Sequence, residues 1–224
     1  MYTILVVDDS PMIVDVFVTM LERGGYTPLI AYSGEEGVEV LQEQKPDLIL
    51  LDIMMEPMDG WETLELIKSD PETRDIPVMM LTAKPLTPEE AQEYGIYIED
   101  YILKPTTHHQ LYGAIEDVLH RRTRIKENVE KAKAAGIPEA TIDEYRRLSK
   151  SVEVNAKLLR ILEKTYRVGN AKAHVGENIS RAIANMKKSI ELQKQRLDQI
   201  KQQIPGAAEE ERERGEKPDE EGAG

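Results

Sequence analysis

The decisive stretch is TILVVDD at residues 3–9, an apolar run followed at once by two aspartates. A second apolar run, LILL at residues 48–51, is followed by Asp52. Nearly continuous apolar runs of this length are typical of parallel strands that are covered on both faces. If the two strands are neighbours, Asp8, Asp9 and Asp52 meet at one end of a sheet. Open α/β sheets usually bind ligands at that edge.

Three carboxylates in one place call for a cation. Crowded carboxylates raise one another's pKa unless a positive charge lies between them. Mg²⁺ prefers oxygen ligands, so the cluster predicts an acidic Mg²⁺ pocket. The chain has no cysteine, which excludes disulfides and thiolate metal sites. Its four histidines, His108, His109, His120 and His174, argue against a zinc cage.

The first 120 residues alternate strand and helix patterns. Strands are expected at 3–7, 27–32, 47–52, 77–82 and 99–103. Amphipathic helices are expected at 11–24, 34–44, 60–69, 88–95 and from 107 onward. Ser10-Pro11 is an N-cap followed by proline, and Gly24-Gly25 ends that helix. Five strands, each followed by a helix, predict a doubly wound α/β sheet.

The rest of the chain has a helical pattern. We expect the fifth helix to continue to about 135, where Gly136-Ile137-Pro138 ends it. Further helices are expected at 139–168 and 171–204, joined by a turn at Gly169-Asn170, and the glutamate-rich end predicts disorder. The predicted organisation is an α/β domain over 1–120, a long-helix hairpin over 121–204 and an acidic tail over 205–224.

Each long helix carries a narrow, coiled-coil-like apolar stripe. A hairpin alone leaves half of such a stripe in water, so we expect it to pair with a second copy or with the extended fifth helix. Asn155 and Gln193 fall on the stripe, where they either fix the register or face a wet gap.

Charge is segregated along the chain. The net charge is −13, but residues 1–120 hold 24 acidic and 6 basic side chains, whereas residues 121–204 hold 10 acidic and 20 basic ones. This asymmetry indicates modules with different partners, or modules that attract each other. No run is long enough to span a membrane and the start lacks a signal-peptide pattern, so we expect a cytoplasmic protein.

Two more polar residues follow apolar strands. Thr82 closes the fourth strand and Lys104 follows the fifth, so both should reach the edge that holds the three aspartates. A lone aspartate after a strand is most often a helix cap. Here Ser10 occupies the cap position, which leaves Asp8 and Asp9 free for another role.

These residues resemble the receiver domain of two-component response regulators. The matching pieces are VDDS at 7–10, LDIMM at 51–55, MDGW at 58–61, LTAK at 81–84 and YILKP at 101–105. The resemblance covers residues 1–120 and implies a flavodoxin-like five-stranded sheet with strand order 2-1-3-4-5.

The resemblance also implies site roles. Asp52 is the expected phosphoacceptor, taking a phosphoryl group from a sensor histidine kinase. Asp9, Asp52 and the backbone carbonyl of Met54 are expected to hold Mg²⁺, and Asp8 to assist through water. The only catalysis implied is the protein's own phosphorylation and dephosphorylation.

Three further residues carry family roles by position. Lys104 is expected to pair with a phosphoryl oxygen, and a cis peptide bond to Pro105 is expected to aim the lysine inward. Thr82 is expected to move toward the phosphoryl group while Tyr101 swings into the vacated space. This switch would reshape the surface formed by the fourth helix, fifth strand and fifth helix.

One position departs from the family pattern. The proline expected four residues after the phosphoacceptor is replaced by Glu56, and proline follows at Pro57. We interpret Glu56 as an added carboxylate near the mouth of the pocket. Lys84, two residues after Thr82, is at a family position linked to the hydrolysis rate.

The helical region leaves three hypotheses open. It is an interaction module that dimerises or binds a helical partner, a nucleic-acid-binding output, or a phosphorelay or phosphatase output. The basic residues are spread along long helices without a helix-turn-helix spacing or stacking aromatics, which argues against nucleic acid. A phosphorelay would use His174 or His120, and a phosphatase Asp198 with Gln202.

Overall fold

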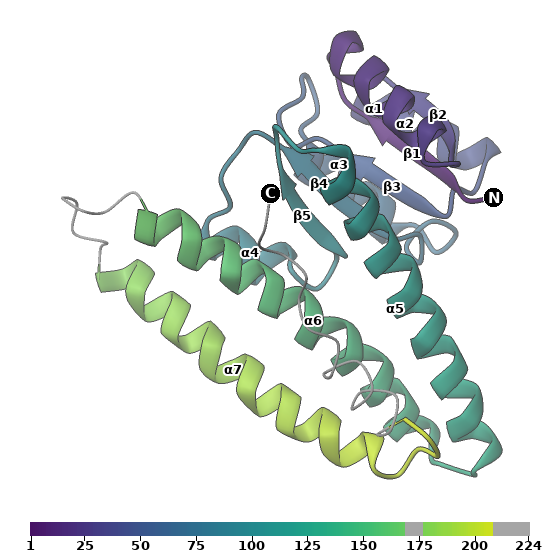
Figure 1. Ribbon diagram of the computed structural model, residues 1–224, viewed down its shortest axis with the longest axis vertical. Coiled ribbons are helices and arrows are strands. Elements are labelled where there is room, and N and C mark those ends of the chain that lie inside the picture. Colours follow the sequence, from purple (N-terminus) through teal and green to yellow (C-terminus); the bar gives the residue numbers. More distant parts are fainter. Residues whose placement is uncertain (169–176, 208–224) are drawn as a thin grey trace.

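The structure is a computed structural model that describes residues 1–168 and 177–207. A sheet with its covering helices occupies one end of the molecule, and three long helices extend from it (Figure 1). The strands are β1 (Thr3–Val7), β2 (Thr27–Ala31), β3 (Leu48–Leu51), β4 (Val78–Thr82) and β5 (Asp100–Leu103). The helices are α1 (Pro11–Arg23), α2 (Gly34–Glu43), α3 (Gly60–Ser69), α4 (Pro88–Tyr94), α5 (His108–Ala134), α6 (Glu139–Val168) and α7 (Glu177–Lys201).

The sheet confirms the expected topology. Its strand order is β2-β1-β3-β4-β5 and every pairing is parallel. Successive strand residues point to opposite faces, so each strand contributes to two apolar layers. Ile4 and Val6 of β1 pack with α1 and α5, whereas Leu5 and Val7 pack in the core shared with α2, α3 and α4.

The long fifth helix supplies a partner for the hairpin. Beyond the sheet, α5 packs with the start of α6 and the end of α7 around one buried cluster. Its members are Val129, Ala132, Ile142, Tyr145, Leu148, Leu197, Ile200, Ile204 and Ala207. Gly136, with a φ of 73°, makes the turn between α5 and α6. Pairing with the extended fifth helix is therefore confirmed, and pairing with a second copy stays a prediction.

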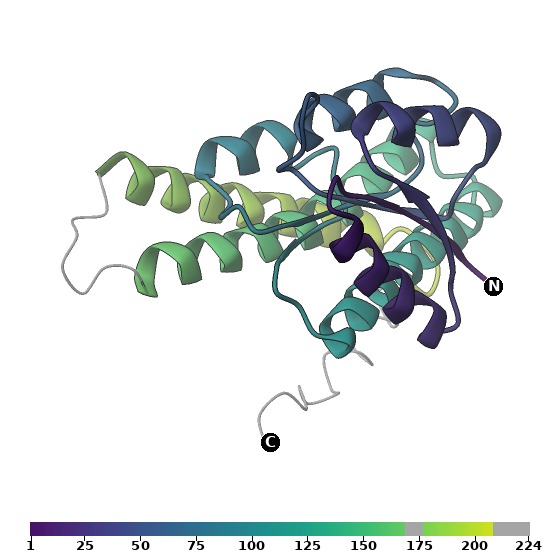
Figure 2. The ribbon, with the colours of Figure 1, turned by 90° about the horizontal axis from the view of Figure 1, so that it is seen from above.

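A buried apolar contact joins α6 to the sheet domain. Val154, Leu158 and Leu162 of α6 are buried in the core cluster that also contains Ala91 of α4. A Cβ added to Gly95, after α4, would lie 3.2 Å from atoms of Leu158. Figure 2 shows α6 and α7 running side by side beyond the edge of the sheet. The second half of α6 is thus docked on the sheet domain.

The two polar stripe residues link the helices of the hairpin. Ser151 of α6 donates a hydrogen bond to Gln193 of α7 at 3.1 Å, and Asn155 donates to Ser151 at 2.9 Å. This pairing fits a role in register. The expected turn at Gly169-Asn170 and most of the expected tail lie outside the described residues, but Ala207 is buried, so packing of the helical region continues past 204.

No helix in the described part of the chain is long and apolar enough to cross a membrane.

Candidate functional site

The three aspartates meet at the carboxyl edge of the sheet, as predicted. Asp8 follows β1 and Asp52 follows β3, and these two strands are paired with Val7 opposite Leu51. The backbone N–H of Asp52 donates to the carbonyl of Val7 at 2.9 Å, which extends the ladder to the acid itself. Strand register therefore sets the separation of the two carboxylates.

The carboxylates form a compact oxygen cluster. One ligand oxygen from each of Asp8, Asp9 and Asp52 lies within 4.8 Å of the others. Asp8 is 3% exposed and Asp52 is 7% exposed, whereas Asp9 faces solvent. Such a set of carboxylate oxygens, open to solvent on one side, fits a hard divalent cation. The triad can hold a metal ion.

Lys104 is the cation that the structure places among these acids. Its Nζ donates to Oδ2 of Asp8 and lies 3.1 Å from Oδ2 of Asp52. The backbone N–H of Lys104 donates to the carbonyl of Thr82 at 2.8 Å, which fixes the end of β5 beside β4. The peptide bond to Pro105 is cis, as expected. The three sequence-predicted residues Asp8, Asp52 and Lys104 are in direct contact.

In each of the two buried acids, one carboxylate oxygen accepts a hydrogen bond from the backbone N–H of a residue that follows it. Oδ1 of Asp8 accepts from the N–H of Ser10 at 3.0 Å, and Oδ1 of Asp52 accepts from the N–H of Ile53 at 2.8 Å. Both Oδ2 atoms are then left facing Lys104. The sequence interpretation of Ser10 was partly wrong, because Ser10 occupies the N-cap position of α1 but its side chain makes no capping hydrogen bond.

Thr82 is fully buried at the end of β4 and is bonded to the loop that follows. Its Oγ1 accepts from the N–H of Lys84 at 3.2 Å. The side chain of Lys84 turns to Glu90 of α4, with 2.7 Å between Nζ and Oε1. Burial alone would raise the pKa of Glu90, but hydrogen bonds from Lys84 and from the backbone of Thr87 hold it below its usual range. Thr82 and Glu90 are thus linked through one residue.

Tyr101 lies inside the protein, 2% exposed, and its hydroxyl donates to the carbonyl of Lys84 at 2.6 Å. Burial, then the charges of Glu90 and Asp52, raise the pKa of its hydroxyl far above the usual value. Its ring centroid lies 6.5 Å from that of Trp61, which stacks on Tyr94 at 4.2 Å. The aromatic residue expected to switch therefore contacts the same loop as Thr82.

Sequence reasoning missed Glu90 as a member of this network. Its Oε1 accepts from Nε1 of Trp61 at 3.1 Å as well as from Lys84. Glu90 also completes a capping box with Thr87 at the start of α4. The spacing of Thr87 and Glu90 is the capping-box signal and could have located the residue, although not its second role.

Two features set the loop after Asp52. Gly60 begins α3 so close to this loop that a Cβ there would lie 2.0 Å from the carbonyl oxygen of Asp52. The site therefore needs glycine at this position. Met54 and Glu56 lie in the loop with exposed side chains, and the bond from Glu56 to Pro57 is cis.

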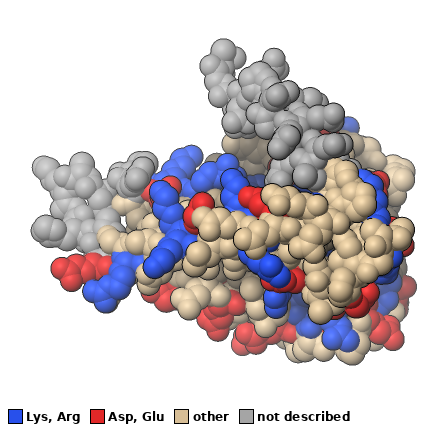
Figure 3. Space-filling view, turned by 90° about the horizontal axis from the view of Figure 1, so that it is seen from below, with Lys and Arg blue, Asp and Glu red and all other residues tan. Residues whose placement is uncertain are grey.

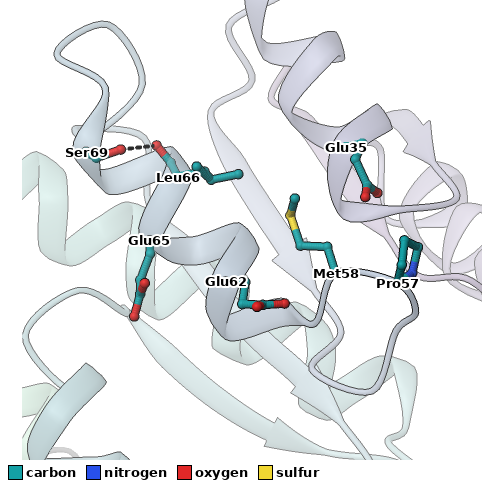
Figure 4. A pocket seen from close by; sticks show the side chains of 7 residues that line it. All are labelled: Glu35, Pro57, Met58, Glu62, Glu65, Leu66 and Ser69. Carbon is teal, nitrogen blue, oxygen red and sulfur yellow. Dashed lines mark hydrogen bonds between the residues drawn. The ribbon is translucent and has the colours of Figure 1, made fainter.

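A separate cleft of about 620 Å³ lies between α2 and α3 (Figure 4). It is lined by Glu35, Pro57, Met58, Glu62, Glu65, Leu66 and Ser69. None of the three clustered aspartates, nor Lys104, lines it. The chemistry therefore belongs to the sheet edge, and not to this cleft.

The described candidate output residues lie exposed on the helices or at their ends, and Asp198 and Gln202 are close, with the N–H of Gln202 donating to the carbonyl of Asp198 at 3.1 Å. His108 and His109 begin α5 and are exposed, as is His120 farther along the helix. His174 lies outside the described residues. Asp198 and Gln202 are both exposed, and α7 ends at Lys201, between them. The phosphorelay and phosphatase hypotheses stay untested predictions.

Two families match the chain. Residues 4–116 match the family described as response regulator receiver domain, and residues 121–208 match the family described as Metanogen output domain 2. The first match covers half of the chain and contains every residue of the acidic site.

Individual relatives match the same half. The phosphate regulon transcriptional regulatory protein PhoB of Pseudomonas aeruginosa is 39% identical over 119 residues, which cover 53% of this chain and 52% of PhoB. Protein PilH of the same organism is 34% identical over 119 residues, 53% of this chain and 98% of PilH. The chain spans about half the length of most of the curated relatives that it matches.

Two solved structures match the same half of the chain. The N-terminal domain of a response regulator receiver protein from Methanoculleus marisnigri JR1 is 82% identical, covering 53% of this chain and 97% of that one, with a TM-score of 0.46. The chemotaxis protein CheY4 of Vibrio cholerae is 28% identical, covering 53% of this chain and 98% of that one, with a TM-score of 0.50. The acidic triad, the parallel sheet and the family match lead to one conclusion: the chain belongs to the response regulator receiver domain family.

Proposed function

We propose that this chain is a two-component response regulator that takes a phosphoryl group from a sensor histidine kinase onto Asp52. The observation that carries the proposal is the contact of Asp52 with Lys104 beside Asp8 and Asp9 at the sheet edge. Phosphoryl transfer needs little more than positioning and stabilisation of negative charge, and this cluster supplies both.

We infer the attacking atom of Asp52 from the contacts of its two carboxylate oxygens. Oδ1 already accepts a hydrogen bond from the N–H of Ile53, whereas Oδ2 is the oxygen beside Lys104. In the proposed step Oδ2 attacks the phosphorus and the bond from phosphorus to the donor imidazole nitrogen breaks. The electron pair of that bond stays on the nitrogen.

We propose that Mg²⁺ binds through Asp9, Asp52 and the backbone carbonyl of Met54, with Asp8 assisting through water. When bound, the ion would neutralise charge on the transferring group. Lys104 has a second task in this scheme, because it now lies between Asp8 and Asp52 and would contact a phosphoryl oxygen instead. Its flexible side chain suits such a change of partner.

Thr82 is the proposed sensor of the phosphoryl group. A movement of its hydroxyl toward a phosphorylated Asp52 would act on Lys84, whose N–H donates to that hydroxyl. The Lys84 carbonyl accepts from Tyr101, so the displacement reaches the buried aromatic ring as well. The proposed switch of Thr82 and Tyr101 is thus a change in one short loop that both residues contact.

The helical region is positioned to respond to this switch. Lys157 of α6 donates to Oδ2 of Asp100, and Oδ1 of Asp100 accepts from the N–H of Tyr101 at 2.7 Å. We propose that phosphorylation alters the packing of α6 on α4 and β5. The proposed parts are a receiver over 1–120 and a partner-binding or dimerising helical module over 121–204. The family matches at 4–116 and 121–208 support this division.

Nucleic-acid binding is the weaker proposal for the output. Several basic side chains of the helical region are already paired with receiver acids, Arg121 and Lys150 with Glu99 and Lys157 with Asp100. Figure 3 shows Lys and Arg interspersed with Asp and Glu on the face that it draws. A continuous basic surface would be expected for phosphate-backbone binding.

The proposed acceptor is tested with the full-length protein. A small phosphodonor with Mg²⁺ should phosphorylate the wild-type chain, and beryllofluoride with Mg²⁺ should change the fluorescence of Trp61, in the first turn of α3 near Asp52. Asp52→Asn should lose both responses, whereas Asp117→Asn, an exposed acid of α5, should keep them. Equal labelling of Asp52→Asn and wild type would falsify the acceptor assignment.

A further inference from the structure

A second polar site lies at the opposite end of β5 from the phosphoacceptor. The start of β5, the second half of α5 and the first half of α6 enclose a cleft of about 1090 Å³. In Figure 1 α5 and α6 meet at their lower ends and diverge toward the sheet. Residues 74–77, which lead into β4, form another wall. The volume lies slightly above the usual range of small-ligand pockets, so the cleft has room for a small organic molecule.

The lining of this cleft is strongly basic. Nine cationic side chains face five acidic ones, an excess of four positive charges. The cations are Lys68, Arg74, Arg121, Arg122, Lys126, Lys133, Arg146, Arg147 and Lys150, and the acids are Asp47, Asp75, Glu99, Glu130 and Asp143. This excess is notable in a chain of net charge −13.

One buried carboxylate serves three of these cations. Glu99 is 5% exposed, and its oxygens lie 2.7 Å from Arg121, 3.1 Å from Lys150 and 4.0 Å from Arg122. Glu153 adds a longer contact to Arg121, at 3.7 Å, but it also pairs with Arg124. The positive charge around Glu99 is therefore only partly compensated by side chains.

Donor groups in the cleft are left over as well. The side chain of Arg121 is 7% exposed, and its buried Nε has no hydrogen-bond partner among the described residues. The side chains of Arg74 and Lys126 make no hydrogen bond or ion pair within the same part of the chain. The side chains of Arg74 and Lys126 are exposed, so their donor groups are open to an anion in the cleft.

The pKa of Lys68 is affected by the same excess of positive charge. Its Nζ donates to the carbonyls of Arg74 at 2.8 Å and Ile76 at 2.6 Å. Burial, and then the nearby charges of Lys150 and Arg122, lower the pKa of Lys68 to about 8, against the opposing effect of Glu99. The surroundings of Lys68 thus disfavour further positive charge.

We propose that this cleft binds a small phosphate-bearing molecule through the exposed side chains of Arg122 and Lys126, with the paired Arg121 and Lys150 adding positive charge beside them. Guanidinium groups match phosphate oxygens in pairs, and a dianion would use the donors that Glu99 cannot serve. The occupant touches α5, α6 and the segment before β4, so it would stabilise the docked arrangement of the two domains. The cleft is distinct from the phosphoacceptor site, because none of its lining residues belongs to the acidic cluster.

Calorimetric titration of the full-length protein tests the site. The probes are inorganic phosphate, pyrophosphate and ADP at low salt, with EDTA present so that the carboxylate cluster repels them. We expect saturable binding, tighter for pyrophosphate and ADP than for phosphate. Arg122→Gln with Lys126→Gln should weaken pyrophosphate binding by about tenfold or more, because two charge-assisted contacts are lost. Lys164→Gln with Lys188→Gln, two exposed lysines outside the cleft, should leave it unchanged.

A variant that is expected to bind pyrophosphate more tightly is a second control, because a loss of folding would not increase the affinity. Glu130→Gln removes an exposed acid of the lining and should tighten pyrophosphate binding by about two- to threefold, since one repulsive charge is gone. The proposal is overturned if wild type binds none of the probes, or if the cleft and control double variants bind pyrophosphate alike. It is also overturned if pyrophosphate fails to bind while duplex DNA binds, which would make the basic lining part of a nucleic-acid surface.

Discussion

The Nζ of Lys104 lies 3.1 Å from Oδ2 of Asp52. The same nitrogen donates to Oδ2 of Asp8, so one lysine neutralises two buried acids. A metal ion that binds these carboxylates has to share them with this ammonium group or displace it. In the proposed mechanism, Lys104 and the metal ion would compete for the carboxylates before phosphorylation and would both bind the phosphoryl group after it.

Removing Lys104 should separate these two roles. We expect Lys104→Met to bind Mg²⁺ about tenfold more tightly, because an internal competitor worth roughly 1.4 kcal/mol is gone. The same variant should lose most of the Trp61 fluorescence response to beryllofluoride with Mg²⁺. Calorimetry measures the first effect and fluorescence the second.

Lys84→Met is the matched control, because Lys84 lies in the adjacent loop but pairs with Glu90 and not with the aspartates. Its Mg²⁺ affinity should equal that of the wild type. Weaker Mg²⁺ binding by Lys104→Met would show that the lysine organises the carboxylates and does not compete for them.

The receiver half could be predicted almost completely from its sequence. Each site residue directly follows or ends an apolar strand, so the register of β1, β3, β4 and β5 alone brings Asp8, Asp52, Thr82 and Lys104 together. The hydrogen bonds of Ser10 and Glu90 could not be predicted in this way. They depend on side-chain rotamers that a strand or helix period does not specify.

The docking of the hairpin on the receiver could not be predicted either. The apolar stripe of α6 shows that Val154, Leu158 and Leu162 need a partner, but a second copy would satisfy the stripe equally well. The charge segregation was the better signal. One of its two interpretations, attraction between the modules, describes the pairs of Glu99 with Lys150 and of Asp100 with Lys157.

Glu99 should be the strongest electrostatic contact between the domains. Replacing it with glutamine leaves Arg121 and Lys150 without their buried counter-ion, so we expect Glu99→Gln to lower the free energy of unfolding by about 3–5 kcal/mol. Urea unfolding at pH 7 measures this loss. Glu72→Gln, which breaks an exposed pair with Lys45, should cost only about 0–1 kcal/mol.

The effect of Glu99→Gln should also depend on pH. Burial opposes the ionised form of Glu99, but Lys150 and Arg121 hold its pKa below the usual 4.5. The folded state then keeps the carboxylate charged at pH values where the unfolded chain takes up a proton. The stabilisation is complete above about pH 4.5 and is lost as the pH falls through the lower folded value. A gap between wild type and variant that grows on acidification would contradict this assignment.

Lys157 should control how firmly α6 is held on β5. Its partner Asp100 is buried and bonded to the N–H of Tyr101. We expect Lys157→Gln to increase amide hydrogen exchange in residues 150–162 several-fold without any phosphoryl mimic, because the interdomain ion pair is lost. Mass spectrometry measures the exchange.

Lys164→Gln, an exposed change on the same helix, is the control and should leave this exchange unaltered. Beryllofluoride with Mg²⁺ should likewise increase the amide hydrogen exchange of residues 150–162 in the wild-type protein. If beryllofluoride with Mg²⁺ instead slows amide exchange in α6, phosphorylation strengthens the packing of α6 on the sheet domain.

Lys68 gives a prediction for the alkaline range. Burial together with Lys150 and Arg122, against the attraction of Glu99 and Asp75, lowers the pKa of Lys68 from 10.5 to about 8 in the folded state. Between these values the unfolded chain binds more protons than the folded one, so the contribution of Lys68 to the free energy of unfolding increases as the pH rises.

Comparison with Lys68→Met isolates this contribution, because all other titrating groups are common to both proteins. We expect the stability of wild type relative to Lys68→Met, from urea unfolding, to increase between pH 7.5 and about pH 10. Pyrophosphate in the basic cleft should reduce that slope, since an anion beside Lys68 favours its charged form and raises its pKa. A slope that pyrophosphate leaves unchanged, in a protein that binds pyrophosphate, would place the anion away from Lys68.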